Sequence, residues 1–301
     1  MKKPAWLIDS SIYVFKAWFT HEDIYDVDGN SINAVVGFMD FVYKLLSEQK
    51  PQLIGFAFDE SLLTSHRREI YPEYKANRAT APDSLRLQFR LCREFLRHLG
   101  ILEGASSFYE ADDLLGTWAK QLNTNLIPVN LITADKDLAQ LVKEGDHWWE
   151  YLRGEKLDEK KITKRFGAKP SQIADQLAIA GDKSDNIPGV PGVGMSTAGK
   201  LLRKFETLEN LLENTSEISS MQIRGAARIQ QLILEHQETI LLARQLTGIV
   251  CDIEEVMPSD FEVSILDTDA FNSFCDQLNL SEKDQEIWLK LHNDLLQNIA
   301  E

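Results

Sequence analysis

Three short apolar runs mark the first half of the chain, and each is followed within two residues by an aspartate. The runs lie at 5–8, 53–58 and 129–133, and the aspartates are Asp9, Asp59 and Asp135. Between the runs, apolar residues recur with helical spacing over 31–48, 84–99 and 111–122. Strand-like runs that alternate with helices predict an α/β fold in which helices cover a parallel sheet.

The second half of the chain has a different pattern, in which short helices replace strands after about residue 158. The turn at 187–194 contains Gly189, Gly192 and Gly194, whose freedom in φ would let two helices meet closely, so we expect a side chain at Gly192 or Gly194 to distort it. Helical spacing follows over 196–205, 226–245, 267–278 and 283–299. We expect three parts: an α/β core at 1–165, a helical subdomain at 166–260 and an acidic helical segment at 261–301.

Composition indicates an ordinary globular protein. Apolar residues make up 44% and charged residues 26% of the chain, and no segment approaches the roughly 20 apolar residues of a membrane span. The apolar run after the basic start ends before Asp9 and is too short for a signal peptide. Cys92, Cys251 and Cys275 are too dispersed for a disulfide framework or a cysteine-built metal site. We expect a cytoplasmic protein that does not bind membranes.

The formal net charge of −15 hides two basic segments. Residues 61–100 hold eight Lys and Arg against four Asp and Glu, and residues 161–204 hold eight against three, whereas 205–301 hold five against nineteen. Charges more than about 10 Å away are largely screened at cellular salt, so a polyanion would respond to the two local surfaces. Ordinary solvated faces have the same pattern, so charge alone leaves the question of a nucleic-acid ligand open.

Further carboxylates come in tight groups near the strand ends. These are Glu110, Asp112 and Asp113, then Asp135 and Asp137, then Asp182 and Asp185. The carboxyl ends of parallel strands share one edge of a sheet, so we expect the groups to converge there. Clustered acids repel one another, and oxygen-only ligation favours Mg²⁺ or Mn²⁺ over zinc as the compensating ion. Taken singly, each Asp-x-Asp could equally cap a helix or turn a loop.

Six short motifs occur in order along residues 5 to about 205. They are LIDSS with Asp9, FAFDE with Asp59, EYKANR at 73–78, YEADDLLG at 109–116, TADKDLAQL at 133–141 and GDKSDNIPGVPGVG at 181–194. In this order and spacing they resemble the 5′ nuclease (flap endonuclease) family, which includes the amino-terminal nuclease domain of bacterial DNA polymerase I and stand-alone phage and bacterial 5′–3′ exonucleases. The last 55 or so residues match no motif. Because no polymerase module precedes Glu301, we expect a stand-alone exonuclease.

The resemblance implies a PIN-like nuclease core, with an arch or clamp at about 61–100, and a helix-loop-helix subdomain that grips duplex DNA. It also implies hydrolysis of phosphodiesters with two Mg²⁺ or Mn²⁺ ions per active site and no protein nucleophile. One implied ligand set is Asp9, Asp59, Glu110 and Asp112. The second set draws on Asp113, Asp135, Asp137, Asp182 and Asp185, some of them through water. Because every position is filled, we expect an active 5′-flap endonuclease and 5′–3′ exonuclease.

The resemblance assigns DNA contacts as well. Lys75 and Arg78 match a basic pair at the base of the arch that would stabilise charge on the reacting phosphate. Phe15 takes the place of an aromatic that stacks on a base, although it could equally fill the core. Further DNA contacts are expected at Lys16, Arg67, Gly189, Gly192, Gly194 and Lys200. A K⁺ ion would bind the backbone of Ile179, Ala180, Pro188, Val190 and Val193.

The implied partner is DNA with 5′ flaps, nicks or 5′ ends, bound by a monomer. Two other interpretations stay open at this point. One is a non-catalytic paralogue that binds DNA flaps or junctions, which the intact carboxylates oppose. The other is a single-strand ribonuclease of a related fold, which the duplex-gripping segment at 181–205 opposes.

Overall fold

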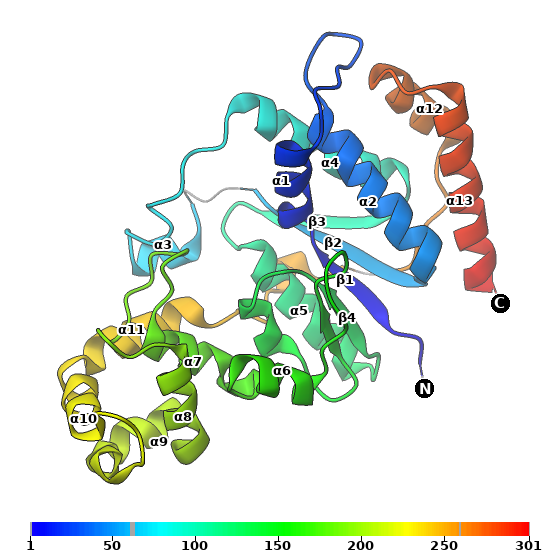
Figure 1. The fold of residues 1–301 in the computed structure, drawn as a ribbon. Coiled ribbons are helices and arrows are strands. Elements are labelled where there is room, and N and C mark those ends of the chain that lie inside the picture. Colours follow the sequence, from blue (N-terminus) through cyan, green and yellow to red (C-terminus); the bar gives the residue numbers. More distant parts are fainter. Residues whose placement is uncertain (1, 61–63, 259, 301) are drawn as a thin grey trace.

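A five-stranded parallel sheet forms the centre of the protein (Figure 1). The computed structural model describes residues 2–60, 64–258 and 260–300. The strands are ordered β3-β2-β1-β4-β5, and their pairings are parallel. Their bounds are Ala5–Asp9 for β1, Leu53–Asp59 for β2, Leu102–Ser106 for β3, Val129–Ile132 for β4 and His147–Trp149 for β5. The predicted parallel sheet is confirmed, and β3 and β5 are edge strands that the apolar pattern did not indicate.

Alternate residues of the central strands face opposite layers of helices. Trp6 and Ile8 of β1 lie in a core cluster with α1, α2 and α4, whereas Ala5 and Leu7 lie in the cluster under α5. A strand that is buried on both faces requires this arrangement. The three helices predicted between the strand runs are confirmed as α2, α4 and α5. The bounds are α1 Ser11–Thr20, α2 Asn33–Gln49, α3 His66–Ile70, α4 Asp83–His98 and α5 Ala111–Thr124.

A helical subdomain lies beside the sheet, at the lower left of Figure 1. The helical pattern predicted at 226–245 is confirmed, and the chain divides there at His236 into two helices, α10 and α11. Both helices bury apolar residues in the same cluster, and the break lets each of them face it. The bounds are η1 Asp137–Leu141, α6 Glu159–Phe166, η2 Pro170–Gln172, α7 Ile173–Ala180, α8 Met195–Phe205, α9 Leu208–Glu213, η3 Thr215–Ser220, α10 Ala226–Glu235 and α11 Gln237–Thr247.

The glycine turn between α7 and α8 depends on its glycines for two different reasons. A Cβ on Gly189 would lie 2.2 Å from the backbone nitrogen of Gly181, so the two backbones approach too closely for any side chain. Gly192 has a φ of +81°, which L side chains rarely adopt. Gly194 has a φ of −92° and open space around its Cβ position, so the expectation that a side chain there strains the turn is wrong.

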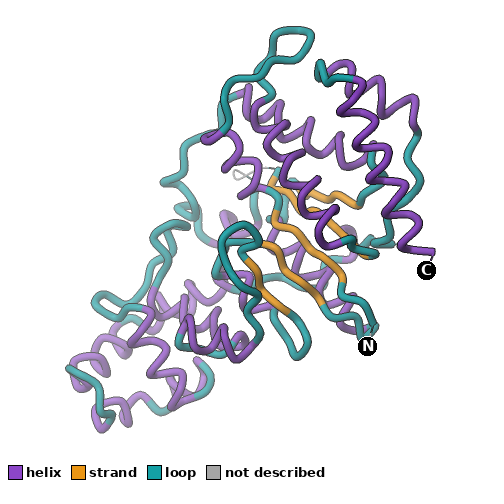
Figure 2. Tube along the Cα trace, turned by 45° about the vertical axis from the view of Figure 1, so that its right-hand side comes forward, coloured by secondary structure: helices purple, strands orange, loops and turns teal. Residues whose placement is uncertain are grey.

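The C-terminal helices pack onto the sheet core. The chain leaves α11, passes through η4 (Glu254–Val256) and pairs Phe261 with β2, since the backbone N–H of Ile54 donates to Phe261 O at 2.8 Å. The last two helices are α12 (Thr268–Gln277) and α13 (Glu282–Ala300), and they lie beside α2 and α4 in both views (Figures 1 and 2). Across the described ranges, no helix is long and apolar enough to cross a membrane.

The glycine turn provides a matched pair of substitutions. Gly189→Ala should lower the free energy of unfolding by about 1–3 kcal/mol, because the added methyl group forces apart two backbones. Gly194→Ala should lower it by only about 0.5 kcal/mol, because nothing lies within 4 Å of its Cβ position and the only loss is the preference for glycine over alanine at the N-cap of α8. Urea denaturation of both variants measures the difference. Equal losses would show that the close approach of Gly189 to Gly181 does not constrain the fold.

Candidate active site

The strand-end aspartates meet at one edge of the sheet. Asp9 ends β1 and Asp59 ends β2, and Asp135 follows β4. The Oγ1 of Thr133 donates to Asp9 Oδ2 at 2.9 Å and accepts the backbone N–H of Asp135 at 2.9 Å, so it ties two strand ends together. Asp59 Oδ1 accepts the backbone N–H of Ala111 at 2.9 Å, which joins β2 to the start of α5.

The acids at this edge raise one another's pKa. Burial raises the pKa of Asp9 to about 8, and the charges of Asp59 and Asp135 contribute to the rise. Burial also raises the pKa of Asp112, in the first turn of α5, with further contributions from Asp135 and Asp9. Asp9, Asp59, Asp112 and Asp135 therefore lie close enough to repel one another strongly when ionised.

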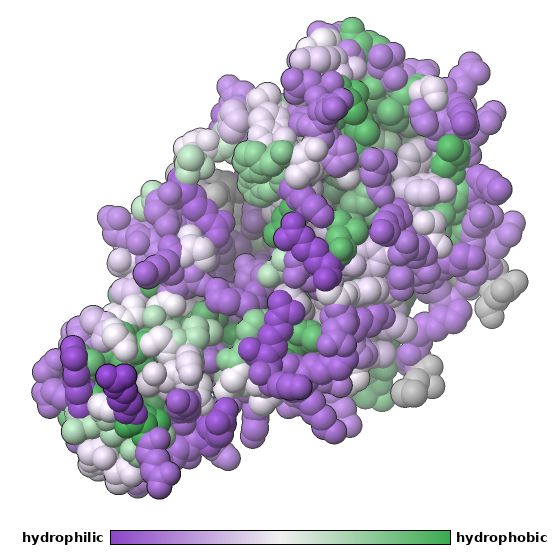
Figure 3. Space-filling model, viewed as in Figure 1, coloured by the Kyte–Doolittle hydropathy of each residue, from purple (hydrophilic) through white to green (hydrophobic). Residues whose placement is uncertain are grey.

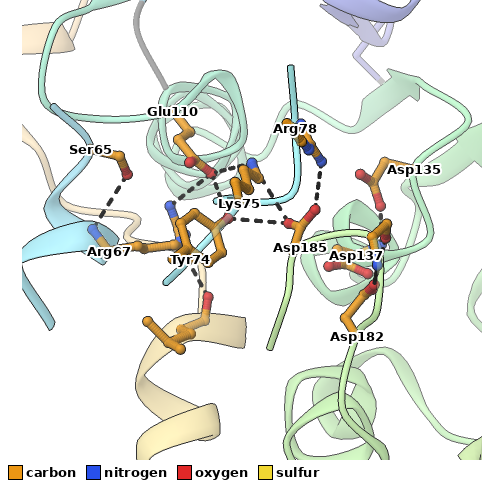
Figure 4. A network of polar contacts seen from close by, with 12 residues as sticks. Ser65, Arg67, Tyr74, Lys75, Arg78, Glu110, Asp135, Asp137, Asp182 and Asp185 are labelled. Atoms are coloured by element: carbon orange, nitrogen blue, oxygen red, sulfur yellow. Dashed lines mark hydrogen bonds and ion pairs between the residues drawn. The ribbon is translucent and has the colours of Figure 1, made fainter. Parts of the chain in front are cut away.

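The pKa of Glu110 is lowered instead, because two cations lie against its carboxylate. Burial alone would raise its pKa, but Lys75 and Arg67 outweigh burial and lower the pKa to about 2. Lys75 Nζ lies 2.9 Å from Glu110 Oε2 and 3.6 Å from Asp185 Oδ2 (Figure 4). Lys75 is buried and has a φ of +52°, an unusual backbone conformation for a lysine that aims its ammonium group at the acids.

A second group of acids faces the first across the site. Arg78 Nη2 lies 2.5 Å from Asp185 Oδ1, and Lys136 Nζ lies 2.5 Å from Asp182 Oδ2 and 3.4 Å from Asp137 Oδ1. Burial, followed by the charge of Asp135, raises the pKa of Asp137 to about 7. The structure therefore places the acids of the 181–187 turn against the base of the predicted arch and against the loop after β4 (Figure 4).

Asp113 is paired with Arg67, which also lies 3.3 Å from Glu110 Oε2 through its Nη1, and this buried pair leads us to revise the predicted roles of both residues. Asp113 is fully buried, and its two oxygens accept hydrogen bonds of 2.7 Å from Arg67 Nη1 and Nη2. The same carboxylate accepts the backbone N–H groups of Glu110 and Val250. Arg67 is only 2% exposed. A fully buried carboxylate that is paired through both oxygens with one buried guanidinium is a poor metal ligand, and a guanidinium buried in that pair cannot contact DNA.

Two residues that the sequence reasoning missed contribute to the cluster. The hydroxyl oxygen of Tyr74 lies 3.0 Å from Glu110 Oε2 and 3.2 Å from Asp185 Oδ2, and Lys136 holds the acids of the second group. Both residues lie inside the sequence motifs, next to residues that the motifs assign to the site. Only their position within a motif could have identified them, because a tyrosine or lysine beside an acid has no periodicity of its own.

The chemistry of the cluster fits divalent metal ions. Among the residues that the structure describes, no three His, Cys, Asp or Glu side chains are already arranged around a single point as a metal site. Glu110 is 4% exposed, however, and its Oε1 has no hydrogen-bond partner. The donors are all oxygens, and the compensating charges paired with them are those of Arg67, Lys75, Arg78 and Lys136. An unpartnered buried carboxylate oxygen among mutually repelling acids is the setting in which Mg²⁺ or Mn²⁺ binds.

The predicted DNA contacts outside the glycine turn lie on α1 and α8. Phe15 on α1 is 40% exposed and meets the edge of Phe89 with ring centroids 5.3 Å apart. Lys16 lines a cavity of about 210 Å³ that also includes Tyr13 and Ala134 beside Asp135. Lys200 is exposed on α8. Figure 3 shows a largely hydrophilic face that is hollowed between the part carrying α1 and α4 and the helical subdomain.

Three of the predicted potassium ligands, Ala180, Val190 and Val193, line a groove beside the turn between α7 and α8. The groove has a volume of about 460 Å³ and includes Ala180, Val190, Val193, Gly189, Gly192 and Gly194. The carbonyl of Ile179 accepts the backbone N–H of Val190 at 2.9 Å, and the carbonyl of Val190 accepts that of Val193 at 3.0 Å. Each of these carbonyl oxygens keeps a second lone pair that could bind a cation.

Comparison with known sequences gives one family over most of the chain. A profile described as the N-terminal resolvase-like domain of 5′–3′ exonuclease matches residues 4–167, and one described as its C-terminal SAM fold matches residues 168–269. DNA polymerase I of Bacillus caldotenax is 37% identical over 253 residues, which cover 83% of this chain and 28% of that protein. The 5′–3′ exonuclease of Aquifex aeolicus is 34% identical over 212 residues, which cover 70% of this chain and 73% of that protein. The chain thus spans little more than a quarter of the polymerase relative.

Comparison with solved structures gives the same fold at lower sequence identity. T5 5′-exonuclease with divalent metal ions (zinc) bound superposes with a TM-score of 0.63 at 17% identity and covers 99% of this chain and all of that one. The catalytic core of Rad2 in complex with a DNA substrate gives 0.63 at 17% identity over 96% of this chain and 92% of that one. These likenesses establish the fold of the α/β core and its helical subdomain.

The metal-free protein should lose stability as the pH rises from about 5 to about 8. The pKa of Asp9 is about 8 in the folded chain against a usual value of 3.8. Over this range the unfolded chain therefore releases a proton that the folded chain retains, which favours unfolding. A pKa difference of one is worth about 1.4 kcal/mol, so we expect a loss on the order of a few kcal/mol. Denaturant titrations in EDTA at several pH values measure it.

Two variants separate this effect from general charge repulsion. Asp9→Asn should flatten the pH dependence and stabilise the metal-free protein at pH 8, because it removes one of the repelling charges. Asp28→Asn, at an exposed position, should leave the slope unchanged. Glu110 does not mask the result. Its pKa is lowered from 4.5, so it makes stability depend on pH only below about pH 4.5. A slope that Asp9→Asn leaves intact would contradict the assignment.

Proposed function

The chain belongs to the 5′–3′ exonuclease family, and on that basis we propose that it is a metal-dependent nuclease that cuts DNA phosphodiesters at 5′ flaps and 5′ ends. The observation that carries the proposal is the convergence of buried, mutually repelling acids at the carboxyl edge of the sheet. Such a cluster costs stability, so its presence favours a catalytic role. The non-catalytic alternative has no observation in its favour, because the acids of both proposed ligand sets are present.

We assign the acids to two divalent ions, with Mg²⁺ as the proposed metal. One set is Asp9, Asp59, Glu110 and Asp112, and the other is Asp135, Asp137, Asp182 and Asp185. Asp113 is left out because it is fully buried in a two-bond pair with Arg67. When bound, two such ions would supply an activated water and a counter-charge for the reacting phosphate. Thr133 and the backbone of Ala111 keep the oxygens of Asp9 and Asp59 in place.

Lys75 and Arg78 supply positive charge at the same place. In this structure they bind Glu110 and Asp185, and these carboxylates are proposed metal ligands. A lysine and an arginine held at the edge of the acidic cluster can contact phosphate oxygens and stabilise the charge that develops during cleavage. Both residues lie at the base of the segment that the sequence predicts as an arch. This geometry supports a catalytic role for the pair.

We place the DNA along the hollowed face. The proposed contacts are Phe15, Lys16, Lys200 and the turn with Gly189, Gly192 and Gly194, whereas buried Arg67 is excluded. We propose that K⁺ binds the carbonyls of Ile179, Ala180, Pro188, Val190 and Val193 and bridges to a phosphate of the duplex. If so, replacing K⁺ with Li⁺ at constant ionic strength should weaken binding of duplex DNA, measured by fluorescence anisotropy. Equal affinity for duplex DNA in both salts would contradict the proposed K⁺ site.

We further propose a cytoplasmic monomer. The described structure has free thiols at Cys92, Cys251 and Cys275, and Cys92 and Cys275 are buried. Unpaired cysteines are typical of proteins from a reducing compartment, where chromosomal DNA is also found.

Asp9→Asn and Asp135→Asn should each lower Mg²⁺-dependent cleavage of a 5′-flap duplex by more than about 100-fold while DNA affinity in EDTA stays within about 3-fold. The reason is that both positions are central to the acidic cluster and neither needs to touch DNA. Product mapping on flap, nicked and blunt substrates measures the activity and its position. Asp28→Asn is the control with the same charge change. Near wild-type turnover of both active-site variants in saturating Mg²⁺ would contradict the proposal.

Lys75→Met and Arg78→Gln should lower kcat by about 10- to 1,000-fold and change DNA affinity by less than about 3-fold, because their charge acts at the reacting phosphate. Steady-state cleavage and binding in EDTA give the two quantities separately. Lys290→Gln removes a charge from an exposed position on α13 and should leave both unchanged. Loss of affinity with normal kcat would instead make Lys75 and Arg78 simple DNA-binding residues.

A further inference from the structure

The chain segment 246–250 consists of the last two residues of α11 and the three that follow, and it is held by side chains from the active-site elements. It begins in the helical subdomain and crosses behind α5 and η1. Five consecutive residues of this segment each give one backbone polar group to a side chain elsewhere in the chain. Backbone of a connecting segment is more often satisfied by water or by its own turns, so this pattern calls for an explanation.

Arg67 and Asp113 hold one side of the segment. Arg67 Nε donates to Leu246 O at 2.9 Å, and Arg67 Nη2 donates to Gly248 O at 2.9 Å. Asp113 Oδ1 accepts the backbone N–H of Val250 at 2.9 Å. Because Arg67 also forms the paired hydrogen bonds to Asp113, these contacts make one buried unit that joins α3, α5 and the segment.

Gln140 holds the other side. Its Nε2 donates to Thr247 O at 3.1 Å and to Asp137 O at 2.9 Å, and its Oε1 accepts the backbone N–H of Ile249 at 3.3 Å. One side-chain amide therefore joins the segment to η1 at the residue that is proposed as a metal ligand. The partners alternate along the segment. Arg67 binds Leu246 and Gly248, Gln140 binds Thr247 and Ile249, and Asp113 binds Val250.

Close packing on α5 adds a contact that involves no hydrogen bond. A Cβ on Gly116 would lie 2.6 Å from Ile249 Cγ2 and 2.9 Å from Cys251 Sγ. The absence of a side chain at Gly116 thus lets the segment lie directly against the helix whose first turn carries Glu110 and Asp112. The segment therefore contacts α5, whose start carries Glu110 and Asp112 of one proposed set, and η1, which begins at Asp137 of the other.

We propose that the 246–250 segment sets the distance between the two ligand sets, with Arg67 and Gln140 as positioning residues for metal binding and cleavage. This inference rests on the proposed nuclease function. The acids repel one another, so contacts on both sides of the cluster must hold their spacing in the metal-free protein. Inside the cluster, Lys75 joins Glu110 to Asp185 and Thr133 joins Asp9 to Asp135. The segment adds contacts from behind the acids, and Arg67 of this unit also lies against a proposed ligand, with Nη1 3.3 Å from Glu110 Oε2.

Gln140→Leu removes the hydrogen bonds of the amide at nearly constant volume. We expect kcat to fall by about 10- to 100-fold and the dissociation constant for Mn²⁺, measured by electron paramagnetic resonance without DNA, to rise by a similar factor. KM and the DNA affinity in EDTA should stay within about 2-fold. Arg67→Lys tests the other side, because lysine keeps a charge for Asp113 but cannot reach both Leu246 O and Gly248 O. It should give the same phenotype and decides alone if Gln140→Leu does not fold.

Gln121→Leu is the matched control. Gln121 lies on the far part of α5, and its Nε2 donates to Pro258 O at 3.1 Å, so it makes the same kind of contact away from the acids. It should lower the thermal midpoint without changing kcat or Mn²⁺ affinity. The proposal is overturned if Gln140→Leu or Arg67→Lys folds with wild-type Mn²⁺ affinity and kcat, or if all three variants lose both equally. A wild type that binds Mn²⁺ but does not cleave DNA would count against the proposed function, and the Mn²⁺ affinities would still decide the role of the segment.

Discussion

Repulsion between buried acids at the carboxyl edge of the sheet is the constraint on which the rest of the structure depends. Burial and then the charge of Asp135, among other acids, raise the pKa of Asp9 and of Asp112, and each of the three is brought there by a different element of the α/β core. Such a cluster is tolerated only where cations or metal ions balance it. Lys75 and Lys136 provide that balance in this structure, and in doing so they hold the arch base and the 181–187 turn against the core.

The centre of the fold could be predicted from the sequence because its strands and helices have clear patterns of apolar residues. Strands β1, β2 and β4 are buried apolar runs, and α2, α4 and α5 have clear helical spacing. The edge strands carry no such signal: β3 is LEGAS, half-buried throughout, and β5 has three residues. The packing of α12 and α13 on α2 and α4 was also beyond reach, because it depends on contacts between parts of the chain more than 150 residues apart.

The acids of the site could also be predicted from the sequence, since strand ends and motif spacing place them on one edge of the sheet. The sequence could not show which acids face the cluster, because Asp112 and Asp113 are neighbours and differ only in the direction in which their side chains point from α5. Asp113 faces Arg67 inside the protein, while Asp112 faces the other acids. Gln140 could not be singled out either, because its role depends on backbone groups more than 100 residues away. Local patterns predict the type of site, whereas tertiary contacts decide the role of each residue.

Proton release on metal binding tests the central claim most directly. If the acids repel one another as described, Asp9 and its neighbours keep part of their protons near pH 7 without metal, and these protons must leave when divalent ions bind. Calorimetric titration of the metal-free protein with Mn²⁺, in two buffers of different ionisation enthalpy, counts the protons released. The account predicts about one proton or more per protein at pH 7. Tight binding of Mn²⁺ with no proton release at that pH would contradict it.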